Sequence, residues 1–165
     1  SMSRLDSAIR RLQAQRDCLN WAVSEIADLP GPVMELGLGN GRTYDHLRSC
    51  LPGRRIYVFE RKVAAHPDCT PDDQHLFEGE FRDTLPGASN RIGQAAALAH
   101  CDIGSGDRDL TAQLAEFVGP ALVPHLAPGA IICTDQAFSA PELQAVNLPQ
   151  GVAPGRYHLY RNKVI

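Results

Sequence analysis

The chain has 165 residues, of which 44% are hydrophobic and 21% are charged, a composition typical of a globular protein with one packed core. Its net charge of −3 and isoelectric point near 6.0 argue against broad binding to nucleic acids or to membrane surfaces. We therefore expect a single domain over residues 1–165, with neither a membrane nor a nucleic acid as partner.

The cysteines and histidines do not form a pattern typical of a metal site or a disulfide framework. No two cysteines stand in a C-x-x-C pair, and no two histidines have the H-x-x-x-H spacing. An odd, dispersed set of thiols fits a reducing compartment, so we predict a cytoplasmic location and no structural zinc. The five cysteines are Cys18, Cys50, Cys69, Cys101 and Cys133.

The first predicted element is an amphipathic helix over residues 3–28. Its apolar residues recur at steps of three and four, Ser3 is a suitable N-cap, and Pro30-Gly31-Pro32 ends the segment. The helix is expected either to pack on the edge of a sheet or, with Trp21, to cover a ligand site or join a partner in a homodimer. The apolar positions are Leu5, Ile9, Leu12, Leu19, Val23 and Ile26.

A short apolar strand then ends at Glu35-Leu36 and turns through glycines at positions 37, 39 and 41 into a helix over residues 43–51. Glycines suit such a turn because they adopt left-handed backbone angles and let a ligand approach the main chain. The dinucleotide fingerprint G-x-G-x-x-G is not matched, because Arg42 stands at its third glycine position. The stretch therefore predicts a strand–loop–helix nucleotide site of a different kind.

The second strand, residues 55–60, ends in Glu60, which follows Gly37 at about the 20-residue spacing expected for an acid that binds ribose hydroxyls. A third strand is predicted over 74–78, before Gly79-Glu80-Phe81. A fourth over 94–103 contains Asp102 near its end. A long helix, interrupted or kinked near Gly119-Pro120, and a turn over 126–129 lead to a fifth strand over 130–135.

Beyond Asp135 we predict one or two helical turns over 141–146 and an antiparallel terminal strand over 156–163 at the edge of the sheet. These elements predict the α/β fold class, a doubly wound and mostly parallel sheet with ligands at the carboxyl ends of its strands. Six strands are counted in all.

The run Glu35-x-Gly37-x-Gly39-x-Gly41 resembles the first motif of class I S-adenosylmethionine-dependent methyltransferases, whose Rossmann-like core has seven strands. Gly79-Glu80 resembles the family's Gly-Asp pair after the third strand, and the L-x-P-G run at 126–129 resembles its approach to the fifth. The resemblance implies S-adenosyl-L-methionine as cofactor and divides the chain into the N-terminal helix, a cofactor-binding core at 33–138 and a C-terminal edge at 139–165.

In this family the first acid helps hold the methionine amino group, directly or through water, so the carboxylates of Glu35 and Glu60 are expected to flank one groove. The adenine amino group would be read by Glu80 or by the backbone beside it. The implied cofactor-binding residues are Glu35, Gly37, Leu38, Gly39, Asn40, Gly41, Arg42, Thr43, Glu60, Arg61, Gly79, Glu80, Phe81 and Asp102.

The reaction implied is methyl transfer to a small molecule, for which Asp102 and Asp135 are the candidate bases. No metal is expected; the alternative is a magnesium ion held by Asp102, Asp135 and Gln136. Two other functions stay open on the sequence, a cofactor-binding sensor or partner subunit without turnover and an NAD-dependent oxidoreductase. His100 and Cys101 are predicted to be core residues rather than catalytic ones.

Overall fold

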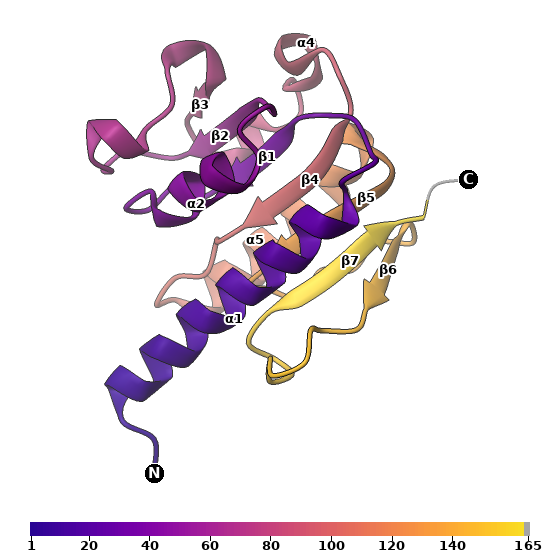
Figure 1. Cartoon of the computed structure of the whole chain (residues 1–165). Helices are drawn as coiled ribbons and strands as arrows, with labels where there is room; N and C mark the ends of the chain where they lie inside the picture. Colours follow the sequence, from indigo (N-terminus) through magenta and orange to yellow (C-terminus); the bar gives the residue numbers. More distant parts are fainter. Residues whose placement is uncertain (164–165) are drawn as a thin grey trace.

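A computed structural model describes residues 1–163; residues 164 and 165 of the predicted C-terminal edge lie outside the described residues. The chain forms one seven-stranded sheet in the order β3-β2-β1-β4-β5-β7-β6 (Figure 1). β1 to β5 are parallel, and β7 runs antiparallel to both β5 and β6. The strands are β1 (Val33–Leu36), β2 (Ile56–Glu60), β3 (Leu76–Glu78), β4 (Ala96–Cys101), β5 (Leu126–Thr134), β6 (Leu143–Val146) and β7 (His158–Asn162).

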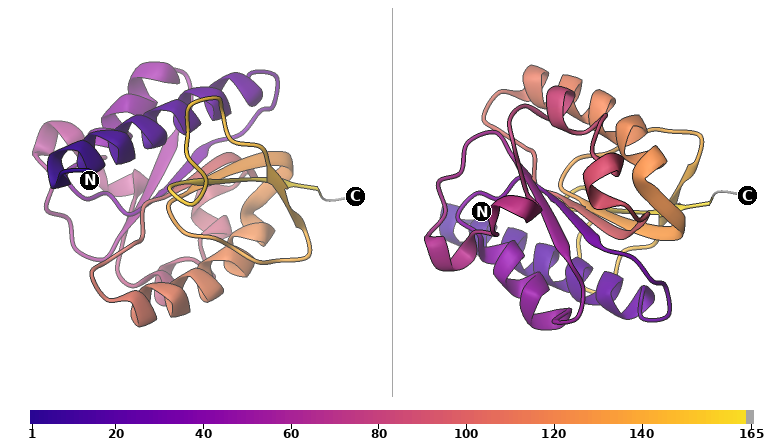
Figure 2. Two further views of the ribbon diagram at one scale, coloured as in Figure 1. Left: turned by 90° about the horizontal axis from the view of Figure 1, so that it is seen from below. Right: turned by 90° about the horizontal axis from the view of Figure 1, so that it is seen from above.

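Helices cover both faces of this sheet, with α1 on one side and α5 on the other in both views of Figure 2. Two apolar clusters fill the spaces between the sheet and these layers, one under α1 and α2 and the other under α3, α4 and α5. The helices are α1 (Arg4–Glu25), α2 (Arg42–Cys50), α3 (Phe81–Thr84), α4 (Ser89–Ile92) and α5 (Arg108–Leu122), with short 3₁₀ turns at Pro67–Cys69, Asp73–His75 and Val123–His125. The doubly wound, mostly parallel sheet confirms the predicted fold class.

The far edge of the sheet differs from the sequence prediction. Residues 143–146 form strand β6 and not helical turns, so the sheet has seven strands where six were counted. β7 is antiparallel as predicted, but it lies between β5 and β6 rather than at the edge. The hydrogen bonds of β7 decide this arrangement, because the sequence of β6 alone has no strong strand signal.

Helix α1 begins with the predicted Ser3 cap, in which Ser3 Oγ accepts from Asp6 N at 3.0 Å and the Asp6 carboxylate reciprocates. Its C-terminal half packs on the sheet through small residues such as Ala14, Cys18 and Ala22, which let the helix come close. Its N-terminal half extends past the sheet (Figure 1), and Leu5 is 70% exposed. Leu5 and Ile9 are both exposed, so this part of α1 does not pack on the sheet, and the alternative of a cover or a dimer contact stays a prediction.

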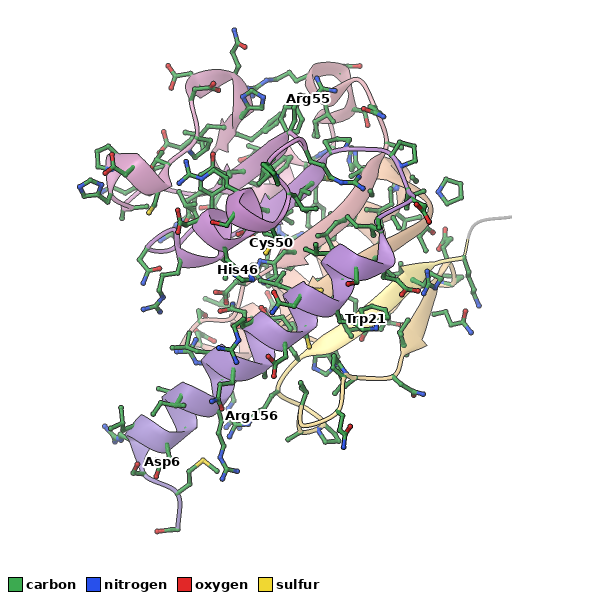
Figure 3. The ribbon with its side chains drawn as sticks, viewed as in Figure 1. Asp6, Trp21, His46, Cys50, Arg55 and Arg156 are labelled. Carbon is green, nitrogen blue, oxygen red and sulfur yellow. The ribbon has the colours of Figure 1, made fainter. Side chains whose placement is uncertain are left out.

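α2 packs beside α1, and Figure 3 shows His46 and Cys50 between the two helices. His46 Nε2 hydrogen-bonds Asn20 Oδ1 of α1 at 2.7 Å, which ties the helix after the glycine loop to the N-terminal helix. On the other face, α5 continues through Pro120 to Leu122, so of the two predicted alternatives the helix is not interrupted there. β5 starts at Leu126, so the predicted turn at 126–129 is an irregular part of the strand, with a register shift opposite β4.

Within residues 1–163, no helix combines the length and the apolar character needed to cross a bilayer.

Candidate cofactor site

The carboxyl ends of the parallel strands meet at a groove of about 650 Å³. β1, β2 and β4 are neighbours in the sheet, so the loops that follow them are brought together at one edge. The lining residues are Gly37, Gly39, Glu60, Arg61, Gly79, Glu80, Phe81, Arg82, Asp102, Ile103, Gly104, Ser105, Leu110, Thr111, Gln113 and Leu114. Eight of the residues predicted from the sequence are therefore brought to one space.

The glycine loop needs its glycines for two different reasons. Gly37 has φ +91°, and a Cβ there would lie 2.2 Å from the Asp102 carbonyl oxygen, so the loop passes directly against the end of β4. Gly41 has φ +85°, and its Cβ would lie 2.5 Å from Cys69 Cβ. Gly39 has φ +54° with no atom within 4 Å of such a Cβ, which leaves the loop open on the side of the groove.

Glu60 stands at the end of β2 and binds the loop directly. Its Oε1 accepts from the backbone nitrogens of Leu38 and Gly39 at 3.2 and 3.1 Å, and its Oε2 accepts from Arg61 N at 2.8 Å. A carboxylate has about four lone-pair sites, so capacity remains for donors from a ligand in the groove. This side chain is fixed by three backbone donors and also faces the cavity.

Glu35 has a different environment from Glu60. It is fully buried, Thr43 Oγ1 donates to its Oε2 at 2.7 Å, and its Oε1 is paired with His100 Nδ1. It does not line the groove, so the expectation that both carboxylates face one cavity holds for Glu60 and not for Glu35. Burial alone lowers the pKa of His100, but the charge and hydrogen bond of Glu35 outweigh it, and the pKa is raised.

Several other predicted residues lie around the groove without lining it. Asn40 Oδ1 accepts from Arg42 N at 3.2 Å and so shapes the start of α2, while Leu38 is buried beneath the loop. Arg42 and Thr43 line a second opening of about 450 Å³ between α1 and α2. The predicted set is thus divided between the groove, this opening and the wall that separates them.

The two candidate bases after β4 and β5 also differ. Asp102 lines the groove, and its pKa is raised by partial desolvation and then by the nearby charge of Asp135. Asp135 accepts from the backbone nitrogens of Ile103 and Gly104 at 3.1 and 2.8 Å, so it holds the loop after β4. Asp135 and Gln136 are absent from the lining, and no cluster of three His, Cys, Asp or Glu side chains in residues 1–163 is arranged to hold a metal ion.

An apolar wall completes the groove, and sequence analysis assigned it no role there. Ile103, Leu110 and Leu114 line the cavity together with the glycine loop, and Leu110 is 60% exposed although it lies on a helix packed against the sheet. Its spacing from Leu114 makes Leu110 part of the apolar stripe of α5. Its position in the first turn, directly after the loop from β4, is the signal that could have placed it at the site.

A family model described as S-adenosyl-L-methionine methyltransferase matches residues 2–162. The chain belongs to this family. A crystal structure of an S-adenosyl-L-methionine methyl transferase from Silicibacter pomeroyi DSS-3 is 45% identical, with a TM-score of 0.91 over 98% of this chain and 99% of that one. The methyltransferase resemblance, the enzyme class and the cofactor predicted from the motifs are thereby confirmed.

More distant structures share the methyltransferase fold. Human methyltransferase-like protein 13, crystallised with SAH, is 12% identical, with a TM-score of 0.52 over 100% of this chain and 83% of that one. MycE, from the mycinamycin biosynthetic pathway, was crystallised with Mg, SAH and mycinamycin VI; it is 15% identical, with a TM-score of 0.57 over 94% of this chain and 48% of that one. No curated protein matches the chain.

Proposed function

We propose that this methyltransferase binds S-adenosyl-L-methionine across the groove and transfers its methyl group to a small-molecule acceptor. The observation that carries the proposal is the convergence of the glycine loop, Glu60 and Asp102 from three neighbouring parallel strands on one cavity. The volume of about 650 Å³ lies in the usual range for small-ligand sites.

The residues of the groove fit the three parts of this cofactor. Ile103 and Leu114, with Phe81 at the start of α3, provide an apolar slot for adenine, and Glu80 lies beside it. Glu60 has free acceptor capacity for the ribose hydroxyls. Asp102 and the open side of the loop at Gly39 would accommodate the positively charged methionine part of the cofactor. We propose that Glu35 contributes to binding this part indirectly, by holding Thr43 and the glycine loop.

The cofactor supplies an activated methyl group, so the chain contributes alignment, exclusion of water and acceptance of a proton. Asp102 is the groove residue suited to take the proton of a hydroxyl or amine acceptor, since its pKa is already raised by burial and by Asp135. Asp135 supports that role by holding the backbone of Ile103 and Gly104.

The acceptor and partner proposals rest on charge and on α1. A net charge of −3 disfavours a nucleic-acid substrate, and MycE, which shares the fold, was crystallised with the small molecule mycinamycin VI. The exposed Leu5 and Ile9 on the part of α1 beyond the sheet support either an acceptor cover or a homodimer contact. We also propose one domain and a cytoplasmic location, the latter on five free cysteines.

Calorimetric titration of S-adenosyl-L-methionine into the intact chain and into a matched pair of variants tests the site. Glu60→Ala removes a carboxylate at the groove and should weaken binding by about 1–3 kcal/mol. Glu78→Ala is the control, because Glu78 ends the neighbouring strand β3, also accepts a backbone N–H, from Val63 at 3.0 Å, and does not line the groove.

Equal losses in the two variants, or no binding by the unaltered chain at millimolar cofactor, would refute the proposed site. Turnover is then measured as formation of S-adenosylhomocysteine with a broad set of small hydroxyl and amine compounds. Cofactor binding without any acceptor in that set would favour the alternative of a sensor or partner subunit.

A further inference from the structure

A chain of buried hydrogen bonds runs beneath the glycine loop. Its first part links α2 to β1 and β4, through Thr43, Glu35 and His100. His100 Nε2 then hydrogen-bonds the hydroxyl of Tyr157 at 2.6 Å. Tyr157 stands just before β7 in the sequence, so the chain of contacts crosses the sheet from the first strand to the C-terminal part of the molecule.

The second part returns to the groove. Gln15, on the face of α1 that packs on the sheet, donates from Nε2 to the Tyr157 hydroxyl at 3.0 Å and to Asp102 Oδ2 at 3.4 Å. Gln15 also lines the opening between α1 and α2, whereas Asp102 lines the groove. Gln15 therefore lines one space and contacts the carboxylate that lines the other.

All four of these polar side chains are buried. Glu35 and His100 are 0% exposed, Tyr157 is 1% exposed and Gln15 is 6% exposed. Buried polar side chains cost folding free energy unless all of them are hydrogen-bonded, and an apolar core is often at least as stable. Burial and then the charge of Asp102 raise the pKa of Tyr157 well above its ordinary value, so its hydroxyl keeps its proton.

The Asp102 carboxylate needs a hydrogen-bond donor to hold its orientation at the groove. The charge of Asp135 lies near it, and in residues 1–163 the side-chain donor that the structure gives to its carboxylate is Gln15. We propose that Gln15 and Tyr157 are positioning residues that fix the Asp102 carboxylate at the groove, so that α1 and the segment before β7 act on cofactor binding through one hydrogen-bonded chain. This inference rests on the proposed function, in which Asp102 faces the cofactor.

A double-mutant cycle separates positioning from simple support of the fold. Gln15→Met keeps the length and approximate volume of the side chain but removes both donors. It is combined with Asp102→Ala, and the dissociation constant of S-adenosylhomocysteine is measured by calorimetry for the unaltered chain, both single variants and the double variant. The control is Gln13→Met, two residues away on the exposed side of the same helix.

Gln15→Met is expected to weaken S-adenosylhomocysteine binding about three- to tenfold when Asp102 is present. When Asp102 is replaced by Ala, the same substitution should change the constant by less than about twofold, because nothing is left to position. Gln13→Met should leave binding unchanged. If Gln15 supports only the fold, Gln15→Met would weaken binding by the same factor whether Asp102 is present or replaced.

Tyr157→Phe provides a second route if Gln15→Met folds poorly, because it removes one hydroxyl and keeps the ring. It should weaken binding by a smaller factor, again only when Asp102 is present. Equal factors in both backgrounds, or no effect of Asp102→Ala itself, would overturn the inference while leaving cofactor binding intact. Failure of the unaltered chain to bind S-adenosylhomocysteine would instead refute the proposed function.

Discussion

The two edges of the sheet satisfy their polar groups in opposite ways. At the carboxyl edge, acids at the strand ends accept hydrogen bonds from the backbone of the loops: Glu60 binds the glycine loop and Asp135 binds the loop after β4. Glu60 and Asp102 also face the groove. At the amino edge, the Arg54 guanidinium donates to the carbonyls of Ile26 and Gly31 at 2.7 and 2.8 Å and closes the end of α1 onto β1.

Each edge also holds a buried histidine. His100, behind the glycine loop, is paired with a buried carboxylate, whereas His125, which precedes β5 at the amino edge, hydrogen-bonds the Ser89 hydroxyl at 2.7 Å. One edge therefore has charged side chains that line the groove, whereas the other uses its polar groups to close the chain. Binding and stability should therefore respond differently to substitutions at the two edges.

The largest difference is expected between the two histidines. His100→Leu would leave the Glu35 carboxylate buried without its charged partner, which should lower the free energy of unfolding by about 3–5 kcal/mol. His125→Leu removes a neutral hydrogen bond to an exposed serine and should cost about 1 kcal/mol. Urea denaturation of both variants measures the difference. Equal losses would show that the Glu35–His100 pair contributes no more to the free energy of unfolding than the hydrogen bond of His125.

The features that the sequence predicted are local ones. The glycine loop, the acid at the end of β2 and the Ser3 cap each lie within a few residues, so a short stretch of sequence determines them. The features it missed depend on distant partners. β6 exists because β7 pairs with it, and the contacts of Gln15 with Tyr157 and Asp102 join segments that no spacing rule connects.

The exposure of apolar residues on α1 could not be predicted for a related reason. Helical periodicity identifies Leu5 and Ile9 as part of one face, but it does not tell how far the sheet extends beneath that face. Leu110 on α5 is a similar case, because the apolar stripe of that helix continues into the groove wall. Periodicity predicts which side of a helix is apolar, and the neighbouring elements decide whether that side is core or site.

A smaller effect is expected at Arg54. Arg54→Met removes two charge-assisted hydrogen bonds to backbone carbonyls and should reduce the free energy of unfolding by about 1–2 kcal/mol. Cofactor affinity, measured by calorimetry, should stay unchanged because the groove lies at the opposite edge. The control is Arg55→Met, since the Arg55 side chain is exposed, contacts Gln94 at 3.4 Å and the Tyr57 ring at 5.9 Å, and donates to no backbone carbonyl among residues 1–163. Weakened cofactor binding in Arg54→Met would contradict the separation of the two edges.

The smallest effect is a difference in pH dependence. Burial lowers the pKa of His125, so its folded-state pKa lies below the value of about 6.5 expected in the unfolded chain. As the pH falls below about 6.5, His125 becomes protonated in the unfolded state but stays neutral in the folded state, so the free energy of unfolding decreases. His100, whose pKa is raised, has the opposite sign: its contribution is complete below about 6.5 and is lost as the pH rises through the raised value.

Urea denaturation of the unaltered chain and of His125→Gln at several pH values between about 7.5 and 5.5 measures the contribution of His125. Since Gln does not titrate, the variant should lose less stability than the unaltered chain on acidification. Above the pKa of unfolded His125, the two curves of unfolding free energy against pH should run parallel, separated by a constant difference. Parallel curves over the whole range would mean that His125 takes up its proton as readily in the folded state as in the unfolded chain. The amino edge would then be more open to water than its buried histidine indicates, and the contrast between the two edges would rest on the Glu35–His100 pair alone.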